Sequence, residues 1–240
     1  MEKTEFKTRM DDRLRRWYRD DDGPTGLAPD PALAARRRYV ASLVNKITMS
    51  GYAQKMGLPL PQCYALVDSV VQLDFSALPE RLVIKPSNSA GNDCVMLFAG
   101  GREVFTGDPV PVPQRADYVR ETFRKGRFTN EHTKILAEEF IQDYDHRFVV
   151  PRDFKVYVAG GKPWITQVVD RTGRKKSWTH RFYDRSWTPY PESFQLANKP
   201  AAPIAPPAML DDLYRLSEQI ALDINCFMRL DFYIATRGVV

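Results

Sequence analysis

The sequence predicts an α+β fold in which antiparallel sheets are flanked by helices. Runs of β-branched and large apolar residues occur in closely spaced pairs, in 82–98 and again in 153–169. Such pairs, separated by a few small or polar residues, are typical of β-hairpins and therefore of antiparallel sheets. Apolar residues recur at helical spacing in 31–47 and 209–224, which is typical of amphipathic helices.

The composition indicates a globular protein with reduced thiols. Of its 240 residues, 43% are hydrophobic and 27% are charged, enough for one large domain or two small lobes. No apolar run approaches the ~20 residues that span a bilayer, and no signal-peptide core is present. Cys63, Cys94 and Cys226 lack metal-ligand spacing and lie in apolar sequence, so we expect core thiols and a cytoplasmic protein. The net charge of +5 favours anionic partners only weakly.

The first sixty residues predict three helices and a linker. Residues 2–19 form an amphipathic helix that we expect to pack on the main body, with membrane or partner binding as a less favoured alternative. A second helix begins at Asp30-Pro31, and a short third helix ends at Gly57. We assign 1–29 to the first helix and its linker.

The stretch 82–98 pairs two predicted strands around a loop of small polar residues. Lys85 stands at the end of the first strand, and the loop contains Ser87, Asn88, Ser89, Gly91 and Asn92. Backbone N–H groups of such a loop bind anions, and a lysine beside them suits phosphate. The alternative is an ordinary hairpin whose lysine has a buried stem, because the Walker pattern of phosphate-binding loops is absent.

Two basic segments have more than one interpretation. Residues 115–127 are predicted to be a surface helix, with an arm over a binding site as the less favoured alternative. Basic and aromatic residues alternate in 171–187, a composition that occurs in proteins that bind single-stranded nucleic acid. No nucleic-acid-binding module accompanies it, so we expect no specific nucleic-acid partner.

Charged residues recur inside or at the ends of strands that otherwise look buried. Charges in such positions are costly unless they are paired or engaged by a ligand. The residues concerned are Lys85, Glu138 or Glu139, Asp153, Lys155, Arg229 and Asp231. A structural salt bridge would account for one pair, whereas both signs on several strands favour a nucleotide–metal site. Cations there contact phosphates, and carboxylates contact Mg²⁺ and ribose hydroxyls.

The order of these motifs resembles the ATP-grasp superfamily, and within it the branch similar to teichuronopeptide-biosynthesis proteins. The resemblance covers 45–240. The motifs that carry it are Asn45-Lys46, residues 57–61, 82–86, 135–141 and 153–157, Asp170-Arg171, residues 180–184 with Trp187, and residues 229–233. It implies two lobes that clamp ATP, which we assign to 30–133 and 134–240, with ATP and Mg²⁺ required.

The resemblance also implies site residues. The ATP-binding residues would be Lys46, Lys85, Ser87, Asn88, Ser89, Gly91, Asn92, Glu138, Glu139, Phe140, Ile141 and Asp153. Among these, residues 139–141 would line adenine, and Asp153 would hold the ribose, where relatives usually have glutamate. Arg229, Lys155 and Arg171 would be catalytic, Asp231 would bind Mg²⁺, and His180 and Arg181 would bind an acidic acceptor.

The function implied by the resemblance is ATP-dependent carboxylate–amine ligation through an acyl-phosphate. The acceptor would be an acidic small molecule or a saccharide, such as a uronic acid of a cell-surface polysaccharide. A kinase and a non-catalytic nucleotide-binding domain are the alternatives.

Relatives continue past the Asp231 strand into a partner strand with a second Mg²⁺ carboxylate, whereas this sequence ends at Val240. We therefore expect a truncated form that binds ATP but turns over at least ~100-fold more slowly than an extended form. We also expect it to self-associate through an open edge beside Phe232 and Ile234.

Overall fold

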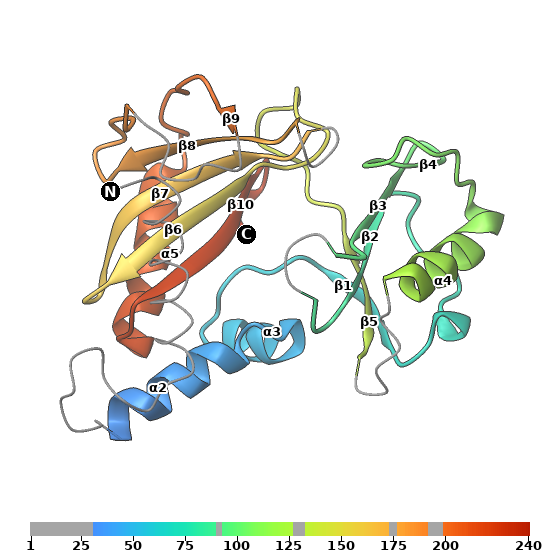
Figure 1. Cartoon of the computed structure of the whole chain (residues 1–240), viewed down its shortest axis with the longest axis horizontal. Helices are drawn as coiled ribbons and strands as arrows, with labels where there is room; N and C mark the ends of the chain where they lie inside the picture. The colour runs from blue at the N-terminus through green and yellow to red at the C-terminus, as the bar shows by residue number, and fades with distance from the viewer. Residues whose placement is uncertain (1–30, 90–92, 127–132, 173–176, 192–198) are drawn as a thin grey trace.

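The computed structural model describes residues 31–89, 93–126, 133–172, 177–191 and 199–240, which form two sheets (Figure 1). The first sheet is antiparallel and has the order β1 (Cys63–Val67), β5 (Ile135–Glu139), β2 (Leu82–Pro86), β3 (Met96–Ala99) and β4 (Arg102–Glu103). The second has the order β11 (Gly238–Val239), β10 (Met228–Ala235), β6 (Asp153–Ala159), β7 (Lys162–Asp170), β8 (Thr179–Asp184) and β9 (Lys199–Pro200). Among the strand pairs of the described residues, only β8–β9 is parallel. The predicted α+β class is confirmed.

Four α-helices fall within the described ranges. They are α2 (Pro31–Ser42), α3 (Lys46–Lys55), α4 (Arg115–Lys125) and α5 (Leu210–Ile224), with short 3₁₀ turns η1 (Val70–Gln72) and η2 (Val112–Gln114). The basic segment 115–127 is thus helical through Lys125, and Gly57 ends the α3 region with a φ of 65°. The helix predicted at 2–19 lies outside the described residues. None of the described helices is long and apolar enough to cross a membrane.

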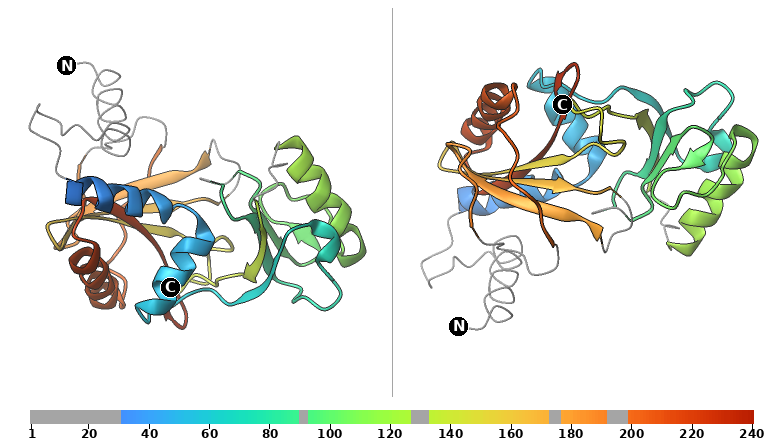
Figure 2. Two further views of the ribbon diagram at one scale, coloured as in Figure 1. Left: turned by 90° about the horizontal axis from the view of Figure 1, so that it is seen from below. Right: turned by 90° about the horizontal axis from the view of Figure 1, so that it is seen from above.

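One face of the first sheet is buried against α4, and its other face is turned toward the second sheet. Leu82 and Ile84 of β2 pack with Val119 and Phe123 of α4, and α4 covers the side turned away from the second sheet (Figure 2). Because side chains alternate along a strand, Val83 and Lys85 point to the opposite side. The helix therefore fixes which residues of β2 face the rest of the protein.

The second sheet is organised in the same way around α5. Leu213, Ile220 and Ile224 of this helix pack on Phe154 and Val156 of β6. Each such side chain, when fully buried, contributes about 1.5–3 kcal/mol to stability. Side chains alternate along a strand, so the residues of β6 between these apolar ones project from the face that α5 does not cover. On that face β6 presents Asp153, Lys155 and Tyr157, and the neighbouring strand β10 presents Arg229, Asp231 and Tyr233.

The structure divides the chain differently from the predicted boundaries. Residue 134 was expected to begin the second lobe, but β5 pairs with β1 and β2 inside the first sheet. The helices α2 and α3 were assigned to the first lobe, yet Val40 and Tyr52 belong to the core of the second. The Tyr52 hydroxyl donates to Asp223 of α5 at 3.0 Å. The predicted boundaries assumed that each lobe is one continuous segment, whereas the chain passes from the second core to the first sheet and back again.

The cysteines and the C-terminal strands also differ from expectation. Of the three free cysteines only Cys226 is buried, whereas Cys63 is exposed because it begins the edge strand β1. The turn at Arg237-Gly238 is present, and β11 pairs Val239 with Ile234. Ile234 is therefore paired and 1% exposed, so it does not lie on an open edge. The β11 pairing does not reach Phe232, and self-association beside that residue stays a prediction.

A buried ion pair organises the segment that joins β5 to β6. The Asp143 carboxylate accepts hydrogen bonds from the Arg152 guanidinium at 2.8 and 3.1 Å and from the Arg152 backbone N–H at 2.9 Å. The guanidinium also lies over the rings of Phe148, at 3.9 Å, and Tyr144, at 4.8 Å. Asp143 and Arg152 are 0% and 3% exposed. The pair thus joins the two ends of the segment 143–152. Asp143 also forms a β-bridge with Ala235 of β10, which places the segment beside that strand.

Removing Asp143 should be strongly destabilising. Asp143→Ala leaves the Arg152 guanidinium buried without its carboxylate, which typically costs about 3–5 kcal/mol. The matched control is Asp117→Ala, which removes an exposed partner of Arg120 and should change stability by less than about 1 kcal/mol. Urea unfolding of both variants measures the difference. Equal stabilities would show that the Asp143 pair does not hold this segment.

Candidate active site

A cavity of about 130 Å³ lies between the two sheets. Ligand pockets are usually about 300–1,000 Å³, so a larger ligand must extend out of this cavity or widen it. The cavity is lined by Lys46, Pro61, Val83, Lys85, Val95, Leu97, Phe105, Glu138, Glu139, Phe140, Ile141, Val150, Pro151, Asp153, Arg171 and Tyr233. It thus brings together eight of the residues predicted from the sequence.

One wall of the cavity is apolar. Leu97, Phe140 and Val150 form a cluster with Val83 and Phe105 packed against it. Val83 could have been found from the sequence, because it lies two residues before Lys85 and hence on the same face. Val150 and Pro151 carried no such signal, since they come from the irregular segment that the Asp143–Arg152 pair holds. A flat heteroaromatic group would suit this wall.

Two lysines from different elements meet at one end of the cavity. The Lys46 ammonium donates to the Ser89 backbone carbonyl at 2.6 Å, and the Lys46 backbone N–H donates to the Ser87 carbonyl at 2.9 Å. Asn45 caps α3 by accepting from the Ile47 N–H at 2.9 Å, which fixes the start of this helix at the loop. The Lys85 ammonium forms an ion pair with Glu138.

Burial, together with the positive charge of Lys85, disfavours the charged form of the Lys46 ammonium. Burial, with a further contribution from Lys85, lowers the pKa of Lys46 to about 8. A lysine whose charged form is disfavoured in this way gains most from an anion that neutralises it. This corner of the cavity is therefore suited to phosphate or carboxylate.

The polar residues after β2 hold the loop in place. The Ser87 hydroxyl oxygen accepts from the Lys134 N–H at 3.1 Å, and the Asn88 amide donates to the Thr133 hydroxyl at 2.8 Å. Both contacts tie the loop to the segment that leads into β5. Gly91 and Asn92, predicted to bind phosphate, lie outside the described residues.

A row of ion pairs lies on the second sheet. Its members Asp153 and Arg171 line the cavity, whereas Lys155, Asp231 and Arg229 continue the row beyond the lining. The row contains five residues whose charges alternate, namely Arg171, Asp153, Lys155, Asp231 and Arg229. Each contacts the next: Arg171 pairs with Asp153, Lys155 with Asp153 at 3.2 Å and with Asp231 at 2.5 Å, and Arg229 with Asp231 at 2.6 Å. The row exists because β6 and β10 place Lys155 opposite Asp231 in antiparallel register.

Asp231 is the carboxylate most open to solvent in this row, with 43% of its side chain exposed, against 5% for Asp153. Burial acts to raise the pKa of Asp231, but Lys155 and Arg229 outweigh it and hold that pKa below its ordinary value. Asp231 is thus an ionised carboxylate.

Mg²⁺ favours carboxylate oxygens and is often held by one or two of them together with phosphate oxygens. The described residues contain no group of three side chains able to hold a metal ion without such help. Asp231 fits Mg²⁺ as one ligand among several.

Two predicted residues, His180 and Arg181, do not line the cavity, and a third, Glu139, lines it but also pairs with an arginine. Arg181 follows His180 in β8 and so points to the opposite face of the sheet. Its guanidinium donates to the carbonyls of Ala201, at 2.7 Å, and Tyr190, at 3.2 Å. His180 is 1% exposed, and burial, followed by the charge of Arg181, lowers its pKa. Glu139 lies at the cavity rim, where Arg237 donates to it at 2.6 Å.

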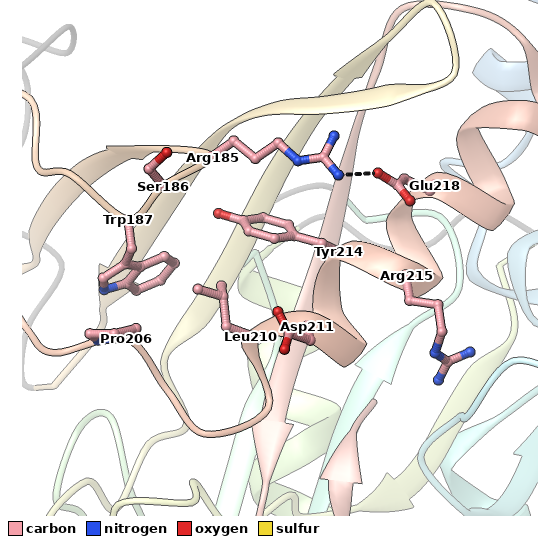
Figure 3. A pocket seen from close by; sticks show the side chains of 9 residues that line it. All are labelled: Arg185, Ser186, Trp187, Pro206, Leu210, Asp211, Tyr214, Arg215 and Glu218. Carbon is pink, nitrogen blue, oxygen red and sulfur yellow. Dashed lines mark hydrogen bonds and ion pairs between the residues drawn. The ribbon is translucent and has the colours of Figure 1, made fainter.

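A larger cavity, of about 370 Å³, lies on the side of the second sheet that α5 covers (Figure 3). Its lining includes Tyr214 and Arg215 of α5, and Arg185 forms an ion pair with Glu218 at 2.5 Å across it. None of the site residues predicted from the sequence lines this cavity, although Trp187 of the motif at 180–187 does. We therefore place the candidate active site between the sheets.

The family model of the TupA-like ATP-grasp proteins matches residues 37–240. The chain belongs to the TupA-like ATP-grasp family. This confirms the resemblance on which the site prediction rested. A search of curated proteins returned no significant match.

Solved structures with a similar fold come from ATP-grasp ligases. D-alanyl-alanine synthetase A from Vibrio cholerae is 12% identical, with a TM-score of 0.48 over 88% of this chain and 55% of that one. D-alanine–D-alanine ligase from Bacillus anthracis, complexed with ATP, is 11% identical, with a TM-score of 0.48 over 86% and 53%. The ligase PsnB, complexed with a precursor peptide and AMPPNP, is 10% identical, with a TM-score of 0.44 over 85% and 48%. The chain thus spans about half the length of these proteins.

The pKa of Lys46 should respond to its two charged neighbours in opposite directions. In the wild-type protein, the pKa of Lys46 should be about 8. The rate at which an acetylating reagent modifies the amine, followed by mass spectrometry as a function of pH, measures this pKa. Lys85→Met removes a cation and should raise the pKa, whereas Glu138→Gln removes an anion and should lower it. Lys125, exposed on α4, is the reference amine. If the pKa of Lys46 were the same in the wild type and in both variants, the charges of Lys85 and Glu138 would not act on Lys46.

Proposed function

We propose that this chain carries the ATP site of an ATP- and Mg²⁺-dependent carboxylate–amine ligase. The observation that carries the proposal is the pairing of two unlike walls around one cavity. Lys46 and Lys85 line the cavity together with the apolar wall. Asp153 and Arg171 line it too, and they belong to the ion-pair row that contains Asp231. Family membership supplies the class of nucleotide chemistry.

In this proposal the apolar wall receives adenine and the lysines receive phosphates. Val83, Leu97 and Phe140 would pack on the base, and backbone groups of 139–141 would read its edge. Lys46 and Lys85 would contact phosphate oxygens, with Ser89, Gly91 and Asn92 closing over them. Ser87 and Asn88 would shape that loop, in keeping with their hydrogen bonds to 133–134. Glu138 would hold Lys85 in position through their ion pair.

The ribose contact predicted for Asp153 is retained as part of the proposal. Asp153 lines the same cavity and is held by Lys155 and Arg171. A carboxylate fixed by two cations can still accept a hydroxyl hydrogen bond through its remaining lone pairs.

The chemistry would proceed in two steps. A substrate carboxylate attacks the γ-phosphate, forming an acyl-phosphate and ADP, and an amine then displaces phosphate from the acyl group. Arg229, Lys155 and Arg171 would offset the negative charge that develops on the transferred phosphoryl group. Mg²⁺, held by Asp231 and phosphate oxygens, would supply further charge neutralisation when bound.

The acceptor is proposed to be an acidic small molecule or a saccharide carboxylate, as in cell-surface polysaccharide synthesis. Arg229 is the best placed residue for it, because 47% of its side chain is exposed beside Asp231 and guanidinium binds carboxylates in a bidentate manner. His180 and Arg181 were predicted for this role. We now assign it to Arg229, since His180 is buried and Arg181 is held by two backbone carbonyls.

Product analysis tests the reaction class. Incubation with ATP, Mg²⁺ and paired panels of carboxylates and amines should release ADP and free phosphate in equal amounts, together with an amide. Phosphate that stays on the acceptor would identify a kinase instead. Lys125→Met serves as the control variant, because Lys125 lies on α4 away from the cavity. ATP binding with no turnover across the panels would argue for a nucleotide-binding domain without catalysis.

ATP affinity should depend on Lys85. A charge-assisted contact is typically worth about 1.5–3 kcal/mol, so Lys85→Met should weaken ATP binding by roughly tenfold to a hundredfold. Because this substitution also strips Glu138 of its partner, the double variant Lys85→Met/Glu138→Gln should recover stability without recovering affinity. Calorimetric titration and thermal unfolding separate the two effects. If both variants bound ATP as tightly as the wild type, Lys85 would not contact the phosphates.

A further inference from the structure

The ammonium group of Lys155 lies between two carboxylates from neighbouring strands. Its nitrogen is 3.2 Å from an Asp153 oxygen and 2.5 Å from an Asp231 oxygen. Asp153 lies two residues away on the same face of β6, and Asp231 stands directly opposite Lys155 on β10. Lys155 and Asp153 are 7% and 3% exposed, whereas 43% of the Asp231 side chain is exposed, so the sheet buries the ammonium and leaves one of its two carboxylates open to solvent.

A single positive centre between two carboxylate oxygens is also the arrangement in which proteins hold a hard divalent cation. The position between Asp153 and Asp231 therefore has the donor chemistry for a metal ion but is filled by an internal cation. Lysine suits this use because its charge is compact and its four-carbon stem is flexible, whereas a guanidinium is planar and rigid.

We propose that Lys155 is a built-in counter-cation that keeps the divalent cation out until nucleotide phosphate arrives. The inference rests on the proposed ATP site and deepens it. In the nucleotide-free protein, Lys155 neutralises Asp153 and Asp231. When phosphates bind beside the row, the ammonium transfers to a phosphate oxygen, and Asp231 becomes available to the cation, while Asp153 keeps its contact with Arg171.

The charge balance of the row gives the physical reason. Three cations, Arg171, Lys155 and Arg229, contact only two carboxylates. A divalent cation added to this positive group would be repelled, and it would have to displace a hydrogen-bonded ammonium from a shielded position. The triphosphate reverses the balance by adding several negative charges.

Arg171 and Arg229 keep the two carboxylates in place while Lys155 moves. Each contacts one carboxylate of the pair, Arg171 that of Asp153 and Arg229 that of Asp231. Cation and nucleotide binding are then positively coupled, and each must raise the affinity for the other by the same factor.

The test is cation binding in the absence of nucleotide, with Mn²⁺ as the probe and electron paramagnetic resonance as the readout. Lys155→Met removes the internal cation and should tighten nucleotide-free Mn²⁺ binding at least about tenfold, as expected when one charge-assisted contact no longer competes. Adding Asp231→Asn to this variant should abolish the gain. Lys155→Gln is a second variant that keeps a polar side chain if methionine impairs folding, which thermal unfolding reports.

Lys125→Met is the matched control. Glu121 is contacted by Arg124 at 2.7 Å and by Lys125 at 3.4 Å, so this carboxylate also has one arginine and one lysine partner. It lies on the exposed surface of α4, without a second carboxylate across from the lysine, and the substitution should leave Mn²⁺ binding unchanged.

Titration of ATP in EDTA separates this inference from the proposed function. ATP binding to the wild type, combined with unchanged Mn²⁺ affinity in both Lys155 variants, would overturn the counter-cation role and leave the ATP site intact. Tighter Mn²⁺ binding in the Lys155 variants supports the counter-cation. If ATP does not bind with or without metal, the proposed function fails, and with it the nucleotide-driven release of Lys155.

Discussion

The antiparallel register between β6 and β10 is the constraint on which the candidate site depends. It sets Lys155 opposite Asp231 and Tyr157 opposite Arg229, so that charges of alternating sign meet on one face. The other face of β6 is bound to α5 by Phe154 and Val156. A slip of one residue would turn the charged residues toward the helix and expose the apolar ones. The hydrophobic core therefore fixes the register, and the register places the charges.

The face of the first sheet that α4 leaves free contacts the rest of the molecule through polar and apolar groups around the cavity. Lys46 bonds to Ser89, and Arg237 bonds to Glu139, while Leu97 and Phe140 pack with Val150. The Arg237–Glu139 pair is partly exposed, and exposed ion pairs contribute little to stability. The cavity that these residues border has a volume of about 130 Å³, which is smaller than typical ligand pockets.

The charged residues within apolar strands were predicted to share one site, and the structure brings several of them close together. Lys85 and Asp153 both line the cavity, and Asp231 is joined to Asp153 through Lys155. Arg181 shows where this reasoning stopped. The resemblance gave it the same acceptor role as its neighbour His180. Adjacent residues of a strand face opposite sides of the sheet, however, and Arg181 donates to the carbonyls of residues 190 and 201 instead.

The sequence by itself determined the α+β class, the hairpins, the α5 helix and the charged strand positions, because each depends on local periodicity. Only the tertiary structure decided that β5 joins the first sheet, that α2 and α3 pack on the second core, and that Val150 lines the cavity. It alone decided that Lys155 bridges Asp153 and Asp231. These features depend on pairings between segments distant in the chain, which no local pattern encodes.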